Sequence, residues 1–356
     1  MSTDANGRWF PLLGIAAVVA ALALAFAGTA GWIGGRVTAR QVIDAIEANN
    51  PQSYPGFRRA HSKGLCVAGT FDSTGDAVAL SSARVFAQAK TPVLGRISIA
   101  GGDPHSPDDA ARVRSIALLL RTDDGQEWRT AMNSFPFFVV ATPEAFFEQV
   151  VAQRPEPATG KPDPRKMAAF VERHPEVRAF QQWAGSAPWP DSWANTQYNG
   201  IHAFRFTAAD GGERFVRWVL RPRAPLVEMT PEQRKEAGPE FLSREFAQRL
   251  AQGPVRWDLV LSIAGPGDAV DDPSKPWPAE RREVVAGTLS VTSATEQAMG
   301  NCRDVNFDPL VLPTGIAPSG DPVLAARSSV YSESFNRRQR EIAGGVAPEA
   351  TGVGGP

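Results

Sequence analysis

Cysteine, histidine and net charge are all scarce in this sequence of 356 residues. Its two cysteines, Cys66 and Cys302, are too few for a disulfide scaffold or a cysteine-rich zinc site. Its four histidines argue against a histidine-rich metal centre. The 37 basic and 38 acidic residues leave a net charge of −1, which provides no basic field for nucleic acid. We therefore expect no nucleic-acid partner.

Several catalytic signatures are also missing. The sequence has no GxGxxG dinucleotide motif, no P-loop, no HExxH and no GxSxG. Kinase, zinc-protease and hydrolase functions therefore have no support. The apolar share of 43% and the charged share of 21% are ordinary for a globular protein. With 32 glycines and 30 prolines, the chain should have many turns and long ordered loops rather than form a helical bundle.

One long apolar run lies near the amino terminus. Residues 9–35 carry no charge, with Trp9 and Trp32 towards the two ends. About 20 apolar residues in a helix cross the hydrocarbon core of a bilayer, and tryptophan favours its interfaces. We expect residues 1–35 to be a transmembrane anchor. A signal peptide cleaved near Ala30 is the alternative, and a buried core helix is a third interpretation. The few flanking arginines leave the orientation open.

The remainder of the chain mixes extended and helical patterns. Alternation and turn signals predict strands over residues 64–71, 93–101, 115–122, 201–208, 213–222, 256–265 and 282–293, with one more after the turn at 123–125. Helices are expected over 36–50, from 142 onward, and over 163–173, 230–252 and 321–342. The tryptophan-bearing stretch 183–193 is expected to be a loop. About eight strands with helices in long connections predict an α+β fold: an antiparallel eight-stranded β-barrel with inserted and peripheral helices.

Two local patterns could carry chemistry. Arg327 and Tyr331 are four residues apart, so they share one face of the last predicted helix. Ionising a tyrosine at pH 7 means lowering its pKa from about 10 to about 7, which requires roughly 4 kcal/mol. One arginine supplies part of this, and a bound Fe(III) could supply the rest. The pair therefore suits a tyrosinate-ligated haem, although a surface pair is the simpler alternative. His61, between Arg58 and Gly64, is not diagnostic alone.

Several segments, taken in order, resemble the haem catalase superfamily in its small catalase-related peroxidase branch. The resemblance covers about residues 50–345. The matching segments are RRAHSKG (58–64), PVLGRISIAGG (92–102), residues 111–128, NSFPFFVV (133–140), residues 307–324, and the Arg327–Tyr331 spacing. Each segment is weak alone, but the common order makes the resemblance specific.

The resemblance implies a haem b cofactor with iron. It implies that His61 and Asn133 are the catalytic residues on the distal side, and that Tyr331 is the proximal iron ligand. Ser98 would hydrogen-bond to His61, Arg327 would support Tyr331, and Phe138 would lie near the haem edge. Three arginines would pair with the haem propionates: Arg58, Arg96 and Arg338.

Two departures from the catalase pattern bear on the reaction. Ala60 and Ser62 flank His61 where catalases usually carry valine and alanine. The sequence also ends 25 residues after Tyr331, without the segments that lock the catalase tetramer and build a long narrow channel. A wider entrance favours a peroxidase over efficient disproportionation of hydrogen peroxide. Such an enzyme would reduce organic peroxides, with hydrogen peroxide as a further candidate substrate and an unidentified electron donor. We expect a monomer or a small homo-oligomer.

The resemblance and the apolar run together predict three regions. Residues 1–35 form the anchor or signal, 36–345 the catalytic domain and 346–356 a disordered tail. The domain is expected on the periplasmic side of the inner membrane, or free in the periplasm after cleavage. An anchored haem carrier without turnover, a lipocalin-like barrel without haem and an allene-oxide-forming enzyme are the alternatives. Cys66 and Cys302 could bridge in an oxidising compartment, but nothing in the sequence brings them together. His202 is interpreted as structural.

Overall fold

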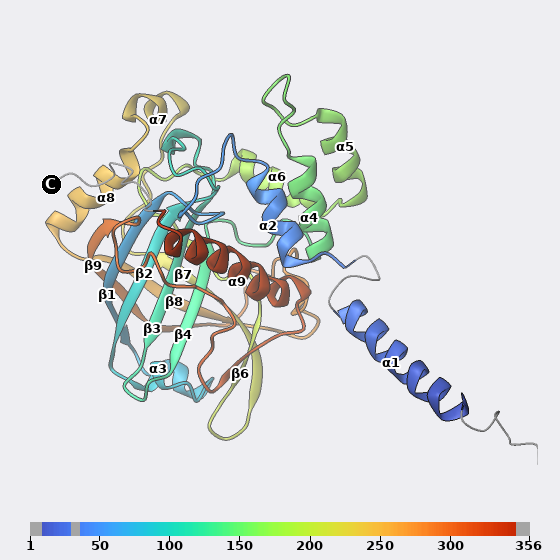
Figure 1. Cartoon of the computed structure of the whole chain (residues 1–356). Helices are drawn as coiled ribbons and strands as arrows, with labels where there is room; N and C mark the ends of the chain where they lie inside the picture. Colours follow the sequence, from blue (N-terminus) through green and yellow to red (C-terminus); the bar gives the residue numbers. More distant parts are fainter. Residues whose placement is uncertain (1–8, 30–35, 347–356) are drawn as a thin grey trace, which may run out of the picture.

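The computed structural model describes residues 9–29 and 36–346 (Figure 1). The side chains of residues 9–12 and 29 lie outside this description. The predicted tail falls, from residue 347 on, outside the described residues. The division of the chain into three regions stays a prediction.

Eight strands close into an antiparallel barrel, as predicted. They follow the order β7-β5-β4-β3-β2-β1-β9-β8, and β8 pairs with β7 to close the ring. Two further strands, β6 (Phe204–Thr207) and β10 (Ile316–Pro318), extend the sheet from β7. The barrel strands are β1 (Gly64–Ser73), β2 (Lys90–Ile99), β3 (Arg114–Arg121), β4 (Glu127–Asn133), β5 (Tyr198–Asn199), β7 (Glu213–Pro222), β8 (Val255–Ile263) and β9 (Glu283–Glu296).

The barrel interior is filled by large side chains. Alternate residues along a strand point to opposite faces, so Val67 and Leu118 join the inner cluster, whereas Cys66 and Ala117 join a second cluster on the outer face. Trp128 and Trp218 meet edge to face inside, with ring centroids 5.1 Å apart. Because this interior is packed, a ligand has to bind outside the barrel wall.

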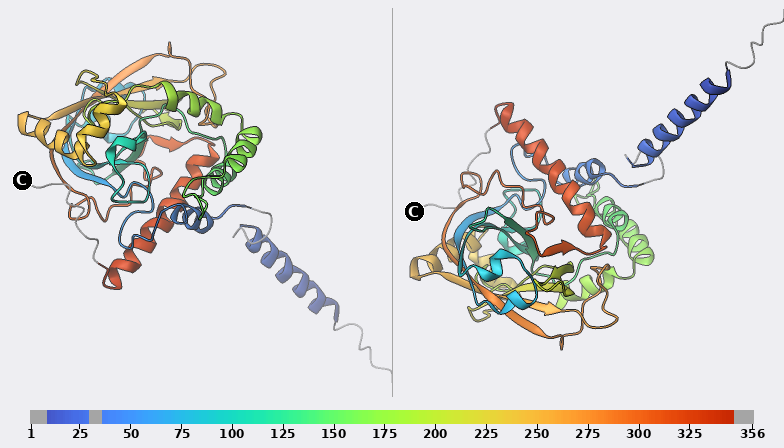
Figure 2. Two further views of the ribbon diagram at one scale, coloured as in Figure 1. Left: turned by 90° about the horizontal axis from the view of Figure 1, so that it is seen from above. Right: turned by 90° about the horizontal axis from the view of Figure 1, so that it is seen from below.

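Helices cover part of that outer wall. The longest in the body, α9 (Pro322–Ala343), crosses the barrel, and α2 (Ala39–Glu47), α4 (Pro143–Ala152), α5 (Pro164–Arg173) and α6 (Val177–Ser186) gather beside it (Figures 1 and 2). The other helical segments are η2 (Asp76–Ala79), α3 (Arg84–Ala87), η3 (Asp108–Ala110), α7 (Pro231–Ala237) and α8 (Phe241–Gln252). The predicted helix starts are confirmed, since Thr142 and Asp163 cap α4 and α5.

Two details differ from the sequence-based expectation. Trp183 lies in α6 rather than in a loop, because Val177, Phe180 and Trp183 recur at helical spacing and form one apolar face. The helix predicted over 230–252 is divided into α7 and α8. The break falls at Gly238, whose φ of +84° lies in the left-handed region and stops the first helix.

The apolar amino-terminal run forms the helix α1 (Trp9–Thr29). Its large apolar side chains from Leu13 onward, such as Val18 and Leu22, are exposed. Within residues 9–29 and 36–346, no helix combines the length and apolarity required to cross a membrane. The prediction of a transmembrane helix is therefore not supported by the described part of the chain.

Candidate active site

A cavity of about 340 Å³ lies between the outer barrel wall and the helices. Its wall brings together the loop before β1, strand β2, the end of β4 and helices α2, α4, α6 and α9. Of the site residues predicted from the sequence, all but Ser98 line it: Arg58, His61, Arg96, Asn133, Phe138, Arg327, Tyr331 and Arg338. Ser98 contacts His61 instead.

Helix α9 supplies one wall of the cavity. The Asp321 carboxylate caps its first turn by accepting from the backbone N–H groups of Val323 and Leu324. From this start, Arg327, Tyr331 and Arg338 fall along the cavity side of the helix. The position at which Asp321 starts the helix therefore sets which of its side chains face the cavity.

Tyr331 lies in a positively charged environment. Arg327 Nη2 donates to the Tyr331 hydroxyl oxygen at 2.9 Å and to the Ala131 carbonyl at 3.2 Å. Burial raises the pKa of Tyr331, but the charges of Arg327, Arg96 and Arg58 outweigh burial and hold that pKa below its usual value of 10.0. If ionised, an oxygen in this position would suit a trivalent metal ion as a ligand.

His61 lies in the same cavity with a constrained backbone. Its φ of +59° lies in the left-handed region, which costs a non-glycine residue about 1 kcal/mol or more. Its carbonyl accepts from Arg96 Nη1 and Gln297 Nε2, each at 3.2 Å, and its Nδ1 lies 3.4 Å from Ser98 Oγ. Burial, with help from Arg96, lowers the pKa of His61 well below 6.5. The imidazole is therefore neutral near pH 7 and can accept a proton.

Asn133 ends strand β4 beside the cavity. Ser115 Oγ donates to its amide oxygen, and Asn199 Nδ2 donates to its backbone carbonyl at 3.2 Å. With the oxygen engaged, the amide NH₂ group is left to donate into the cavity. Phe138 forms part of the apolar wall and packs on Phe146, with ring centroids 5.6 Å apart.

Three arginines surround the cavity without a carboxylate partner. Within the described residues, no acidic side chain forms an ion pair with Arg58, Arg96 or Arg338. The Nε atoms of all three arginines, and Nη2 of Arg338, are buried and have no hydrogen-bond partner among the described residues. Burial lowers the pKa of Arg96 and Arg338 to about 10, and of Arg58 well below 12.5. Buried cations are stable only when paired, so this cluster requires an anionic ligand with several acceptor oxygens.

The barrel and the site fit a haem protein, an oxidoreductase that acts on peroxide. A sequence model of the family described as catalase matches residues 37–342. The chain belongs to the catalase family, in the branch of the catalase-related peroxidases.

Individual relatives agree with this assignment. A catalase-related peroxidase of Synechococcus elongatus is 40% identical over 339 residues, which cover 95% of this chain and 99% of that protein. One from Mycolicibacterium paratuberculosis is 37% identical, covering 88% of this chain and 99% of that protein. Catalase A from Saccharomyces cerevisiae shares the fold with a TM-score of 0.72 at 19% identity, over 83% of this chain and 64% of that one.

Haem, the cofactor of this family, fits the residues present. Two propionates would satisfy the requirement of Arg58, Arg96 and Arg338 for carboxylate oxygens. The phenol oxygen of Tyr331, once ionised, would suit ferric iron, and phenylalanine side chains such as Phe138 would suit the macrocycle. One ligand would thus use both the unpartnered arginine nitrogens and the Tyr331 oxygen.

Two long-range contacts of the site were not predicted from the sequence. His202 is fully buried, and its Nδ1 lies 2.5 Å from Asp321 Oδ2, although the two residues are 119 positions apart. Burial lowers the pKa of His202 to about 4. This contact links His202 to the cap of the helix that carries Tyr331. The other contact is a disulfide between Cys66 and Cys302. No local signal in the sequence indicates either pairing.

Proposed function

We propose that the protein is a haem-dependent peroxidase that reduces organic peroxides to alcohols at the expense of two one-electron donors. The observation that carries the proposal is a neutral histidine, His61, with the amide donor Asn133, in the same cavity as the Arg327–Tyr331 pair. The reaction takes ROOH, two electrons and two protons to ROH and water. The two catalytic groups suit the proton transfers, and the arginine–tyrosine pair suits the cofactor.

The roles of the residues follow from their hydrogen bonds. His61 takes the proton of the hydroperoxide and returns it to the departing oxygen. Ser98 orients the imidazole through Nδ1, and Asn133 donates to the peroxide. Arg327 keeps Tyr331 ionised as the iron ligand, while Arg58, Arg96 and Arg338 hold the propionates. When bound, the haem supplies the redox-active iron that takes oxidising equivalents from the peroxide and passes them to the donor.

The absorption spectrum of the full-length protein with haem tests the proposal. We expect a ferric haem with a tyrosinate ligand, and oxidation of a chromogenic donor that requires cumene hydroperoxide. Stable haem without donor oxidation would instead indicate a haem carrier.

Apolar residues of the cavity wall support an organic peroxide as substrate. Helix α2 contributes Val42, Ile43 and Ile46, and α6 contributes Phe180. An alkyl or aryl group of the peroxide would be removed from water against these side chains, at about 25 cal/mol per Å². Hydrogen peroxide has no such group, so it gains nothing from the apolar wall.

The Ile46→Asn substitution should therefore affect kcat/KM differently for the two peroxides. We expect kcat/KM for cumene hydroperoxide to fall about 10-fold, which corresponds to roughly 1.4 kcal/mol of lost apolar contact. For hydrogen peroxide kcat/KM should stay within about 2-fold. Steady-state kinetics with both peroxides provide the measurement, and Val78→Asn, at an exposed valine outside the cavity, is the matched control. Equal losses for both peroxides would argue against the apolar wall as a substrate surface.

We further propose that the body works outside the cytoplasm, on the periplasmic side of the inner membrane or free in the periplasm. The disulfide supports this location, because disulfides persist in oxidising compartments. The uncharged segment 9–35 is the part of the sequence that could deliver or anchor the body there.

A bacterial host that expresses the full chain tests the location. We expect externally added protease to digest the body in spheroplasts, and thiol alkylation before lysis to leave Cys66 and Cys302 unmodified. A protected body whose two cysteines are alkylated would place the protein in the cytoplasm. Recovery of the body in the membrane fraction or in the soluble fraction would then distinguish an anchored body from a released one.

A further inference from the structure

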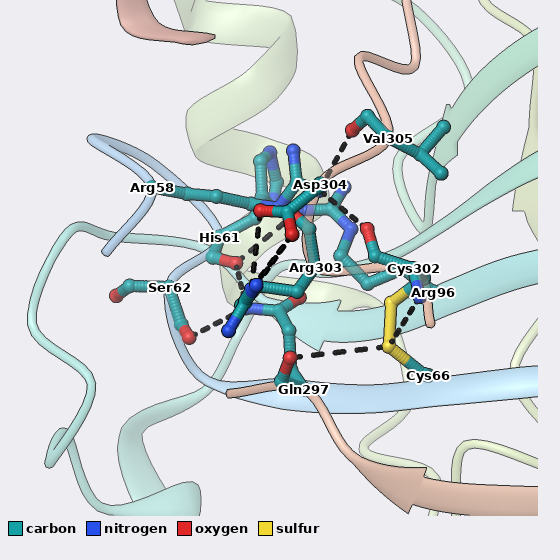
Figure 3. Close-up of a disulfide and its surroundings, with 10 residues drawn as sticks. All are labelled: Arg58, His61, Ser62, Cys66, Arg96, Gln297, Cys302, Arg303, Asp304 and Val305. Atoms are coloured by element: carbon teal, nitrogen blue, oxygen red, sulfur yellow. Dashed lines mark hydrogen bonds and ion pairs between the residues drawn. A yellow bond between two sulfur atoms is a disulfide. The ribbon is translucent and has the colours of Figure 1, made fainter. Parts of the chain in front are cut away.

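The Cys66–Cys302 disulfide lies beside two residues of the site, Arg58 and Arg96, rather than at a remote part of the fold (Figure 3). Cys66 belongs to β1, and Cys302 to the irregular segment 297–315 between β9 and β10. Both are buried, with exposed fractions of 1% and 0%. Gly300 passes so close that a Cβ there would lie 2.5 Å from Cys66 Sγ. The segment is therefore pressed against the barrel wall at the disulfide.

The strand register places the disulfide in one row with residues of the site. Cys66 on β1 is directly opposite Arg96 on β2, Arg96 is opposite Ala117 on β3, and Ala117 is opposite Ala131 on β4. Directly opposed residues point to the same face of a sheet. Cys66, Ala117, Ala131 and Cys302 accordingly share the outer cluster, against which Tyr331 packs. The disulfide and the haem-site residues thus share one surface.

Three backbone carbonyls, those of Cys302, Arg303 and Val305, hold the side chain of Arg58 and are here called the bracket. Arg58 Nη2 donates to the carbonyls of Cys302, Arg303 and Val305 at 2.9, 3.0 and 2.8 Å. Figure 3 shows these residues beside Arg58. The bracket occupies one end of the guanidinium and leaves the buried Nε–H without a partner. That N–H would be available to a propionate.

The disulfide is the main tie of this bracket to the barrel. On one side, Gln297 is held by its backbone N–H to the Gly64 carbonyl and by its side chain to Ser62. On the other side, Arg129 binds the carbonyls of Asn306 and Val311. Between them, residues 298–305 have mostly local turns. Their long-range contacts are the disulfide with the adjoining Cys302 N–H to Cys66 Sγ bond, the three bonds from Arg58 and one Asp304–Gln339 contact. Opening the disulfide should therefore loosen residues 298–305 and leave the flanks attached.

We propose that the disulfide is a positioning element of the haem site: it fixes the three carbonyls that aim Arg58, so that opening it weakens haem retention. Arginine has about 2 kcal/mol of side-chain rotamer entropy, so a buried arginine without a carboxylate needs such fixed acceptors to hold one orientation. The proposal rests on the assignment of Arg58 to a propionate.

The rate of haem transfer to apomyoglobin measures retention without using activity. For Cys66→Ala with Cys302→Ala in the full-length protein, we expect haem loss about 10-fold faster than in the wild type. Arg58→Ala should have a similar effect. When all three substitutions are combined, haem loss should be within about 2-fold of Arg58→Ala alone, because the disulfide acts through Arg58. Independent effects that multiply would overturn the proposal, as would unchanged haem loss in the cysteine variant.

Two further arms separate positioning from general stability. Leu289→Ala weakens the barrel interior and should leave haem loss near the wild-type rate once folding is confirmed.

In haem-free wild type, dithiothreitol supplies the two electrons and two protons that convert the disulfide to two thiols. Amide exchange should then accelerate in residues 298–305 and not in Asn306 or Val311. Exchange that rises throughout the barrel, or nowhere, would contradict the proposal. Failure of oxidised wild type to bind haem would instead contradict the function proposed above.

Discussion

Replacing His61 with alanine is expected to lower peroxide-dependent donor oxidation by about three orders of magnitude, with the haem content unchanged. A positioned general acid–base group contributes typically 10²–10⁴-fold, and the described cavity wall offers no second imidazole. Haem should stay bound because the arginines and Tyr331 are untouched. The measurement is the single-turnover rate constant with cumene hydroperoxide, beside the haem-to-protein ratio. Normal turnover in this variant would remove His61 from the mechanism.

The pH profile provides a second readout for His61. Its pKa lies well below 6.5, so the neutral, proton-accepting form persists as the pH falls through 6.5. The wild-type rate should therefore stay level through that pH and decline only at lower values, when the imidazole becomes protonated. His105→Ala, on an exposed loop, is the matched control and should reproduce the wild-type profile. An acid limb centred at 6.5 would mean that His61 is not held neutral by its surroundings.

Local patterns account for most of what the sequence could predict. Strand alternation places residues on one face or the other of the barrel, and the spacing of Arg327 and Tyr331 is set by the helix repeat. Proline and the capping side chains fix the starts of α4, α5 and α9 without help from distant residues. The grouping of the candidate site residues in one cavity followed from the ordered resemblance, because no single segment determines how distant strands pair.

Contacts that depend on long-range register could not be predicted. The pairing of His202 with Asp321 requires the loop before β6 to meet the first turn of α9. The disulfide requires residue 302 to lie over β1, which follows from the path of an irregular segment with no periodic pattern. The bracket on Arg58 uses backbone carbonyls, which every residue has and which therefore leave no mark in the sequence.

One set of charges lowers two pKa values in the cavity. At His61 burial is the larger cause, and Arg58, Arg96 and Arg327 add to it by disfavouring a proton on the imidazole. At Tyr331 the same arginines act against burial and favour loss of the proton from the hydroxyl. The surroundings of Tyr331 differ from those of His61 in one respect: Arg327 donates a hydrogen bond directly to the phenol oxygen.

Replacing Tyr331 with phenylalanine should abolish the tyrosinate-ligated haem spectrum and weaken haem binding by about two orders of magnitude. The variant keeps the ring but removes the oxygen that would bind iron, and it leaves Arg327 without its partner at 2.9 Å. Haem titration followed by absorption spectroscopy measures both effects. Retention of some haem through the three arginines would still leave the spectrum changed, because the propionate contacts do not ligate the iron.

Tyr198→Phe is the matched control for this substitution. Tyr198 is also buried, and its hydroxyl donates to the Trp193 carbonyl at 3.1 Å, but it lies in the barrel interior rather than in the cavity wall. Burial raises the pKa of Tyr198 well above its usual value of 10.0, so it is a neutral phenol. Its loss should lower stability by about 1 kcal/mol and leave the haem spectrum as in the wild type. An unchanged spectrum in Tyr331→Phe would refute the assignment of Tyr331 as the iron ligand, because the two variants would then differ only in the position of a lost hydrogen bond.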